Sequence, residues 1–266
     1  AHADFSVFGE QGRRPGSFVR PRAVGVHRDE VYVIDMSGRV QVFDRSGTLQ
    51  RLWNMPDFRN GTPTAIAFHE ETVFIPDTHY HRIIAYSRTG DTLREWGAYG
   101  SAPGAFIYPT GLARAADGTC YISEYGTDAE RIQVFTDTGE HLRGWGSFGA
   151  APGRFNRAMA LTLAQDHVCV ADTANHRVQG FRTSGELVRV IDGANLPGGA
   201  FHFPHDIATA PGQTLLVVEY GANRVTHLDI AGGVLGIYGG PGRGPGGFKS
   251  PRGVAVSPEG VVYVAD

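Results

Sequence analysis

The sequence predicts an all-β fold built from repeated four-stranded antiparallel sheets, and three observations support this prediction. First, residues 168–181, VCVADTANHRVQGF, alternate apolar residues on both sides of a short polar tip, which is typical of a β-hairpin. Second, similar hairpins recur along nearly the whole chain, and the acids that close them stand 42 to 48 residues apart. Third, helical periodicity is missing, whereas 37 Gly and 15 Pro suit many tight turns.

Each repeat carries the same markers in the same order. A short strand opens with a dipeptide such as Pro21-Arg22, an acid ends the second strand, a basic residue begins the third, and a glycine turn leads into the fourth. The six acids are Asp35, Asp77, Glu124, Asp172, Glu219 and Asp266. The five basic residues are Arg39, Arg82, Arg131, Arg177 and Arg224. Four strands in roughly 45 residues is the period of propeller blades, so the sequence predicts a six-bladed β-propeller.

The two ends of the chain are expected to form the last blade together. Asp4–Gly9 resembles a fourth strand, and we expect it to pair into the last blade and close the ring, while residues 248–266 supply that blade's first and second strands. Residues 1–266 would then be a single domain whose last blade has no third strand. Two explanations are open: the natural chain continues past Asp266, or a partner donates the strand by β-augmentation.

Composition narrows the classes of function. A formal net charge of −3 argues against a chain built as a whole to bind nucleic acid or an anionic membrane. No window approaches 18 consecutive apolar residues, so no membrane span is expected. Cys120 and Cys169 fall in predicted strands and are expected to be two buried thiols without a disulfide.

The acid–base pairs that recur in every repeat are expected to be structural. Across a short turn the carboxylate can accept turn amides, and the arginine can bridge neighbouring blades. The pairs of this kind that stand five residues apart are Asp77 with Arg82, Asp172 with Arg177, and Glu219 with Arg224.

The residues that break the repeat are the candidates for function. In a propeller the strand-opening residues and the turns between second and third strands share one end of the central channel, the channel mouth. His205-Asp206 places a carboxylate where the other repeats have Ala or Gly, and it is either bonded to neighbouring backbone or in contact with a ligand. Arg22 and Arg252 open adjacent blades, and His205 opens the next one round; the two arginines either clamp a carboxylate or phosphate together with His205 or pair with the acidic residues of the ring.

The repeats resemble the NHL family. Segments such as FKSPRGVAVSPEGVVYVAD and FNRAMALTLAQDHVCVADTANHRVQGF follow the family's F-x-x-P-x-G-[VI]-A-V, Y-V-x-D and N-x-R-[IV]-Q-x-F patterns, over essentially residues 4–266. The resemblance implies a propeller, but the family includes RNA-binding and protein-binding domains, secreted bacterial propellers and peptide-amidating lyases. The lyase branch implies several strand-opening histidines around zinc, and here only His205 occupies such a position.

We therefore expect a binding or scaffolding propeller that recognises a protein partner or a small anionic ligand at the mouth. The alternative is a metal-dependent lyase or hydrolase with a cross-blade site around His205 and Asp206. No cofactor is expected, and zinc or calcium would be the metal if one were bound, for example at the His79-Tyr80-His81 tip. RNA is not expected, because acids in the same turns cancel the arginines. The resemblance and the start without Met favour a secreted bacterial protein, periplasmic or extracellular.

Overall fold

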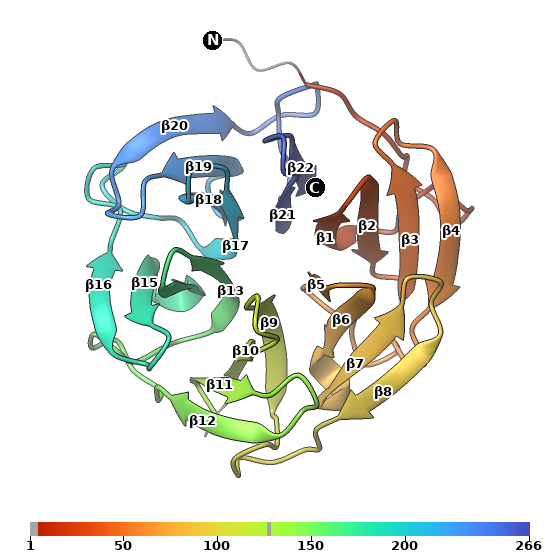
Figure 1. Cartoon of the computed structure of the whole chain (residues 1–266). Coiled ribbons are helices and arrows are strands. Elements are labelled where there is room, and N and C mark those ends of the chain that lie inside the picture. Colours follow the sequence, from red (N-terminus) through yellow and green to blue (C-terminus); the bar gives the residue numbers. More distant parts are fainter. Residues whose placement is uncertain (1–4, 127–128) are drawn as a thin grey trace.

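The computed structural model, which describes residues 5–126 and 129–266, shows a ring of sheets around a central channel (Figure 1). Five sheets are four-stranded and antiparallel, in the orders β1-β2-β3-β4, β5-β6-β7-β8, β9-β10-β11-β12, β13-β14-β15-β16 and β17-β18-β19-β20. Strands β1, β5, β9, β13 and β17 are innermost, and β4, β8, β12, β16 and β20 lie at the rim (Figure 1). The all-β propeller with four-stranded blades is thus confirmed.

The strands follow the repeat markers closely, because every third strand begins at its arginine. In the first two blades the strands are β1 Pro21–His27, β2 Glu30–Asp35, β3 Arg39–Asp44, β4 Leu49–Asn54, β5 Ala67–His69, β6 Thr72–Asp77, β7 Arg82–Ser87 and β8 Thr92–Trp96. In the next two they are β9 Tyr108–Arg114, β10 Cys120–Tyr125, β11 Arg131–Phe135, β12 His141–Trp145, β13 Ala158–Ala164, β14 His167–Asp172, β15 Arg177–Arg182 and β16 Leu187–Ile191. The remaining strands are β17 Pro204–Ala210, β18 Thr214–Glu219, β19 Arg224–Leu228, β20 Val234–Gly239, β21 Gly253–Val256 and β22 Val262–Ala265.

Helical structure in the described part of the chain is limited to two 3₁₀ turns, η1 Thr78–Tyr80 and η2 Thr173–Asn175. Each follows the acid that ends a second strand, in the turn that leads to the third strand. Neither turn is long or apolar enough to cross a membrane.

The prediction of six blades is wrong in this structure, which has five. The last unit is a two-stranded sheet, β21-β22, which lies between the β17–β20 blade and the β1–β4 blade (Figure 1). The predicted pairing of Asp4–Gly9 into it is also not seen: residues 5–10 form no strand, and residue 4 lies outside the described residues. The physical reason is that a fourth strand needs a third strand to bond to, and β22 has no neighbour on that side.

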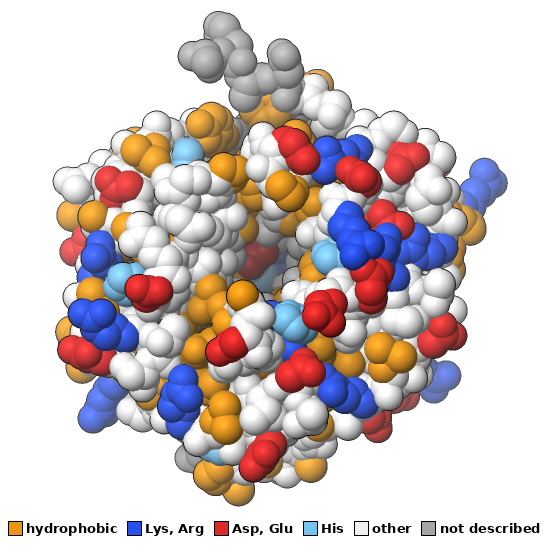
Figure 2. Space-filling model, in the orientation of Figure 1, with side chains coloured by type: hydrophobic (Ala, Val, Ile, Leu, Met, Phe, Trp, Pro, Cys, Tyr) orange, Lys and Arg blue, Asp and Glu red, His pale blue; other side chains and the backbone are white. Residues whose placement is uncertain are grey.

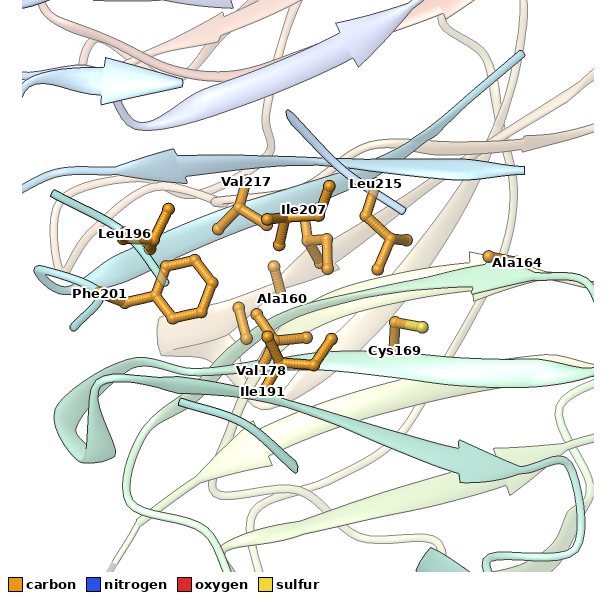
Figure 3. Close-up of a cluster of buried hydrophobic side chains, with 12 residues drawn as sticks. Ala160, Ala164, Cys169, Val178, Ile191, Leu196, Phe201, Ile207, Leu215 and Val217 are labelled. Carbon is orange, nitrogen blue, oxygen red and sulfur yellow. The ribbon is translucent and has the colours of Figure 1, made fainter. Parts of the chain in front are cut away.

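The core is divided into clusters that join neighbouring blades. Between the fourth and fifth blades, Cys169, Val178 and Leu215 belong to a cluster whose members are all buried (Figure 3). Cys120 lies in another such cluster, between the second and third blades. Both thiols are buried and free, as the sequence predicts. Because each sheet is covered by its neighbours on both faces, the second and third strands are almost entirely buried.

Charged side chains at the surface are largely paired. Figure 2 shows Lys or Arg together with Asp or Glu side chains gathered over the β1–β4 blade, beside the hollow at the centre of the ring. In this part of the molecule Glu30 binds the guanidinium of Arg51 at 2.6 Å and that of Arg88 at 2.7 Å. Arginine contacts to Glu30 lower its pKa to about 2 against the opposing effect of burial. The charges of these surface arginines are therefore neutralised by acids, and an arginine that is available to a ligand has to lie elsewhere in the molecule.

Candidate ligand site at the channel mouth

A β-bulge marks the first strand of four blades at the same place. The strand register shifts at Arg22, Thr110, Met159 and His205, so that each of these residues has no direct partner on the second strand. A bulge leaves the extra residue out of the ladder and re-aims its side chain. The four strand-opening residues thus share the same bulged backbone position.

Polar side chains at the channel mouth join most neighbouring blades by hydrogen bonds. Thr64 Oγ1 donates to Thr110 O at 3.3 Å, and Thr110 Oγ1 donates to Ala158 O at 2.8 Å. Thr173 Oγ1 donates to Pro204 O at 2.6 Å. These bonds hold the second to fifth blades together around the channel.

Arg22 and Arg252 do not follow this arrangement. Neither guanidinium forms an ion pair with any of the residues that the structure describes, and the buried Nε of Arg22 has no hydrogen-bond partner among them. Burial, and secondly the charge of Arg252, lower the pKa of Arg22. The charge of Arg252 thus acts on Arg22 from the adjacent unit, and no described acid forms an ion pair with either guanidinium.

Aromatic rings accompany the mouth arginines. The Arg252 guanidinium lies over the Tyr220 ring, 4.5 Å from its centroid, and Arg157 lies over Tyr125 at 5.3 Å. Tyr125 stacks on Tyr108 with 5.0 Å between the centroids. Such stacking orients a guanidinium without neutralising it, so its N–H groups stay available to an acceptor.

His205 is held by Arg252 at both ring nitrogens. Its Nδ1 lies 2.9 Å from Arg252 O, and its Nε2 lies 3.3 Å from Arg252 Nη1. A carbonyl can only accept, so Nδ1 is the protonated nitrogen, and Nε2 accepts from the guanidinium. Burial, and secondly the positive charge of Arg252, lower the pKa of His205 to about 4. The imidazole is neutral at pH 7 and orients the Arg252 side chain.

Asp206 is tied to the backbone of two units. Its Oδ1 accepts from Ile207 N at 2.9 Å, and its Oδ2 accepts from Val254 N at 2.8 Å in the neighbouring β21. The equivalent Gly111 has no room for a side chain, since an added Cβ would lie 2.7 Å from Ala160 Cα. Burial raises the pKa of Asp206 to about 7, although the hydrogen bonds from these two N–H groups act to lower it.

The acid–base pairs predicted in the turns all form ion pairs. Arg177 Nε lies 2.7 Å from Asp172 Oδ2, and the other guanidinium nitrogens donate to the carbonyls of Ala150, Ala151 and Arg154. Equivalent pairs, at 2.7 to 3.0 Å, join Asp35 with Arg39, Asp77 with Arg82, Glu124 with Arg131, and Glu219 with Arg224. These acids are at most 1% exposed, so the acids are not available to neutralise the mouth arginines.

The histidine tip of the second blade does not form a chelating pair. His81 Nδ1 contacts Ile107 O, whereas His79 packs against Gly61. Both rings lie near the Tyr108 ring, with centroids 5.6 and 5.8 Å away. Within the described residues, no group of three or more His, Cys, Asp or Glu side chains is placed to hold a metal ion.

Three residues of the mouth were not predicted from the sequence. Arg157 and Tyr108 precede the strand-opening position and differ from repeat to repeat, so no repeat pattern marks them. Glu130 stands directly before the third-strand arginine, where no other repeat has an acid. This difference from the other repeats could have identified Glu130 from the sequence. Its carboxylate accepts from Arg157 N at 2.9 Å, and burial raises its pKa to about 7.

Comparison with known families identifies one repeat directly. Residues 156–181 match the family model described as NHL repeat, which confirms the resemblance inferred from the repeats. This segment contains β13, β14, η2 and all but the last residue of β15. No curated protein matched the sequence.

Solved structures of similar shape share the propeller. The chain superposes on a protein of unknown function from Bacteroides thetaiotaomicron with a TM-score of 0.72 and 15% identity, covering 97% of this chain and 70% of that one. A streptogramin B lyase structure gives a TM-score of 0.66 and 14% identity over 93% and 91% of the two chains. A chain of a nidogen/laminin complex gives 0.64 and 18% over 82% and 79%. At such identities the likeness shows the fold alone.

Proposed function

We propose that this propeller is a binding module whose channel mouth recognises an anionic group, a carboxylate or a phosphate, through Arg22 and Arg252. The observation that carries this function is the pair of neighbouring guanidiniums without a described acid partner. Holding two like charges together costs free energy, and an anion between them removes that cost. The arginines that begin the third strands are each neutralised by a paired acid, whereas no described acid forms an ion pair with Arg22 or Arg252.

The surroundings of the two arginines favour a ligand that is anionic at one end. The Arg252 guanidinium lies over the Tyr220 ring, and its Nη1 donates to His205 Nε2. Donors that are held in place in this way bind planar, bidentate acceptors more tightly than flexible donors do. Tyr108 and Tyr125, both on the third blade, offer a ring surface for the remainder of a ligand. An acidic side chain or a terminal carboxylate of a protein partner has the same chemistry as a small anion.

A reaction centred on His205 and Asp206 has less support. Both nitrogens of the imidazole and both oxygens of the carboxylate bind other parts of the protein. A general acid or base must reach the proton that it transfers, and either residue would first have to give up one of these bonds. We therefore propose that His205 and Asp206 hold the neighbouring groups of the channel mouth in position.

The test is a titration with sodium phosphate, and separately with sodium succinate, at constant ionic strength. An anion that binds the folded state raises the thermal midpoint with concentration. We expect a rise for the wild type that is lost in Arg22→Gln and in Arg252→Gln. Arg243→Gln is the matched control, because Arg243 is an exposed arginine in the loop between β20 and β21 and forms no ion pair within the described chain. Equal rises in all four proteins would contradict the proposal.

A further inference from the structure

Two large aromatic side chains are exposed on the fifth blade, beside the channel mouth. Phe203, directly before β17, is 46% exposed, and Tyr220, directly after β18, is 37% exposed. The two residues are joined through the backbone, because Tyr220 N donates to Phe203 O at 3.1 Å. The Phe203 ring covers Gly221, where an added Cβ would lie 2.9 Å from Phe203 Cδ2. Phe203 and Tyr220, the fifth-blade rings, thus form one exposed aromatic surface.

The backbone holds Phe203 in a conformation that a bulky residue rarely adopts. Its φ is +51°, in the left-handed region, as it is for Arg20 and Arg157 at the same position before the first strand of their blades. An arginine there keeps its charged end in water, whereas Phe203 places an apolar ring at the same point. His176 fixes this ring, because Phe203 N donates to His176 Nδ1 at 3.3 Å and the two centroids are 4.3 Å apart. Strained backbone of this kind is concentrated at binding sites.

The mouth arginines lie next to the fifth-blade rings. The Arg252 guanidinium is 4.5 Å from the centroid of the Tyr220 ring. Burial and then the charge of Arg252 lower the pKa of Arg22, whereas nearby tyrosines, Tyr220 among them, act to raise it. Both guanidiniums are therefore near Tyr220. An anion that binds them has the fifth-blade rings within reach of the rest of the molecule.

The rings on the third blade are less open. Tyr108 and Tyr125 stack on each other, with 5.0 Å between the centroids, and Arg157 lies over Tyr125 at 5.3 Å. Both tyrosines are partly buried. Because their neighbours already cover part of these rings, the fifth blade offers the more accessible aromatic surface at the mouth.

We propose that the ligand of the mouth is an aromatic acid, whose anionic group binds Arg22 and Arg252 and whose ring packs against Phe203 and Tyr220. This inference rests on the proposed function, because it assigns the remainder of the same ligand. The faces and edges of aromatic rings carry opposite partial charges, so an aromatic ligand gains from these contacts beyond the apolar area that it buries.

The experiment compares phenylacetate with cyclohexylacetate, each titrated into the 266-residue chain at constant ionic strength and followed by NMR chemical shifts. The two acids carry the same charge, and the cyclohexyl ring has at least as much apolar area, so a preference for phenylacetate measures ring–ring contact. We expect phenylacetate to bind the wild type about three- to tenfold more tightly. Phe203→Leu should bind the two acids almost equally. Phe148→Leu is the matched control, because Phe148 is an exposed phenylalanine in the loop between β12 and β13, and this variant should keep the preference.

The comparison of the two acids on the wild type requires no variant, so it tests the inference even if Phe203→Leu folds poorly. Equal binding of both acids to the wild type would overturn the aromatic ligand and leave the proposed function standing. Failure of both acids, of phosphate and of succinate to bind would overturn both. Loss of the preference in Tyr125→Leu but not in Phe203→Leu would place the ligand ring on the third blade and would also overturn this assignment.

Discussion

Two sets of arginines in this ring have different surroundings. The turn arginines, of which Arg177 is an example, are 9 to 20% exposed and each binds a buried acid at 2.7 to 3.0 Å. Of the mouth arginines, Arg252 contacts the Tyr220 ring and His205, and neither Arg252 nor Arg22 pairs with an acid in the described structure. The difference teaches that the repeated arginines belong to the fold, whereas those that break the repeat are available to a ligand.

The largest effect is expected for removal of a turn arginine. Arg177→Gln leaves the carboxylate of Asp172 buried without its cation and removes the hydrogen bonds from the guanidinium to the carbonyls of Ala150, Ala151 and Arg154. We expect the free energy of unfolding to fall by about 3–5 kcal/mol. Urea denaturation measures this, with Arg182→Gln as the control: Arg182 is 58% exposed, pairs with Glu186 at 3.3 Å, and should cost less than about 1 kcal/mol. Equal costs for the two variants would remove the distinction between turn and surface arginines.

Among the turn acids, Asp77 is the exception that sharpens the comparison. Its Oδ1 is buried without a described hydrogen-bond partner, whereas Asp172 Oδ1 accepts from Asn156 N at 2.8 Å. Burial raises the pKa of Asp77 to about 6 despite Arg82. We expect Asp77→Asn to cost at least about 1 kcal/mol less than Asp172→Asn at pH 7. A larger cost at Asp77 in urea denaturation would show that its orphan oxygen is satisfied after all.

Asp206 gives a pH-dependent prediction with a definite sign. Its pKa of about 7 lies above the ordinary unfolded value, so the folded state holds more protons between pH 4 and 7. Its contribution to stability is present below pH 4 and is lost as the pH rises through 7. Asp206→Asn should therefore gain about 1 kcal/mol or more relative to the wild type between pH 4 and pH 7.5. Urea denaturation at both pH values checks this, and a constant difference between the two proteins would be inconsistent with the burial of this carboxylate.

The smallest effect concerns the pKa of His205. Arg252 is the second cause, after burial, of its low value of about 4. In Arg252→Gln we expect the pKa to rise by less than about one unit, because burial remains. NMR titration of the imidazole measures it. An unchanged pKa would mean that Arg252 lies farther from the ring than the 3.3 Å contact indicates.

The sequence predicted the strands well because the repeat encodes them locally. Asp35, Asp77, Asp172 and Glu219 end second strands, and arginine begins every third strand, as expected. The prediction of a sixth blade, closed by Asp4–Gly9 although its third strand is lacking, was wrong, because Asp4–Gly9 resembles a fourth strand in sequence but has no third strand among the described residues to pair with. A sequence pattern indicates which strand of a blade a segment could form. The segment pairs as that strand only when the adjacent strand is present.

The mouth was only partly predictable. Arg22, His205, Asp206 and Arg252 stood out because they differ from the other repeats, and the bulges place Arg22 and His205 outside the strand ladder. The contacts that specify their roles join residues about 48 apart, such as Asp206 with Val254 N, and depend on the angle between neighbouring blades. No local pattern contains that angle. The ring of threonine bonds and the stack of Tyr108 on Tyr125 were missed for this reason.

The most direct measurement compares the unfolding free energy of the wild type with that of the double variant Arg22→Gln, Arg252→Gln, without and with phosphate at constant ionic strength. Without phosphate, the double variant should be at least as stable as the wild type, because removal of the repulsion between the guanidiniums offsets the loss of the stacking contact with Tyr220 and of the hydrogen bond to His205 Nε2. With phosphate at about 100 times its dissociation constant, the wild type should gain about 2.7 kcal/mol and the variant nothing. A variant that is several kcal/mol less stable without phosphate, or that gains as much as the wild type with it, would contradict a ligand role for the mouth arginines.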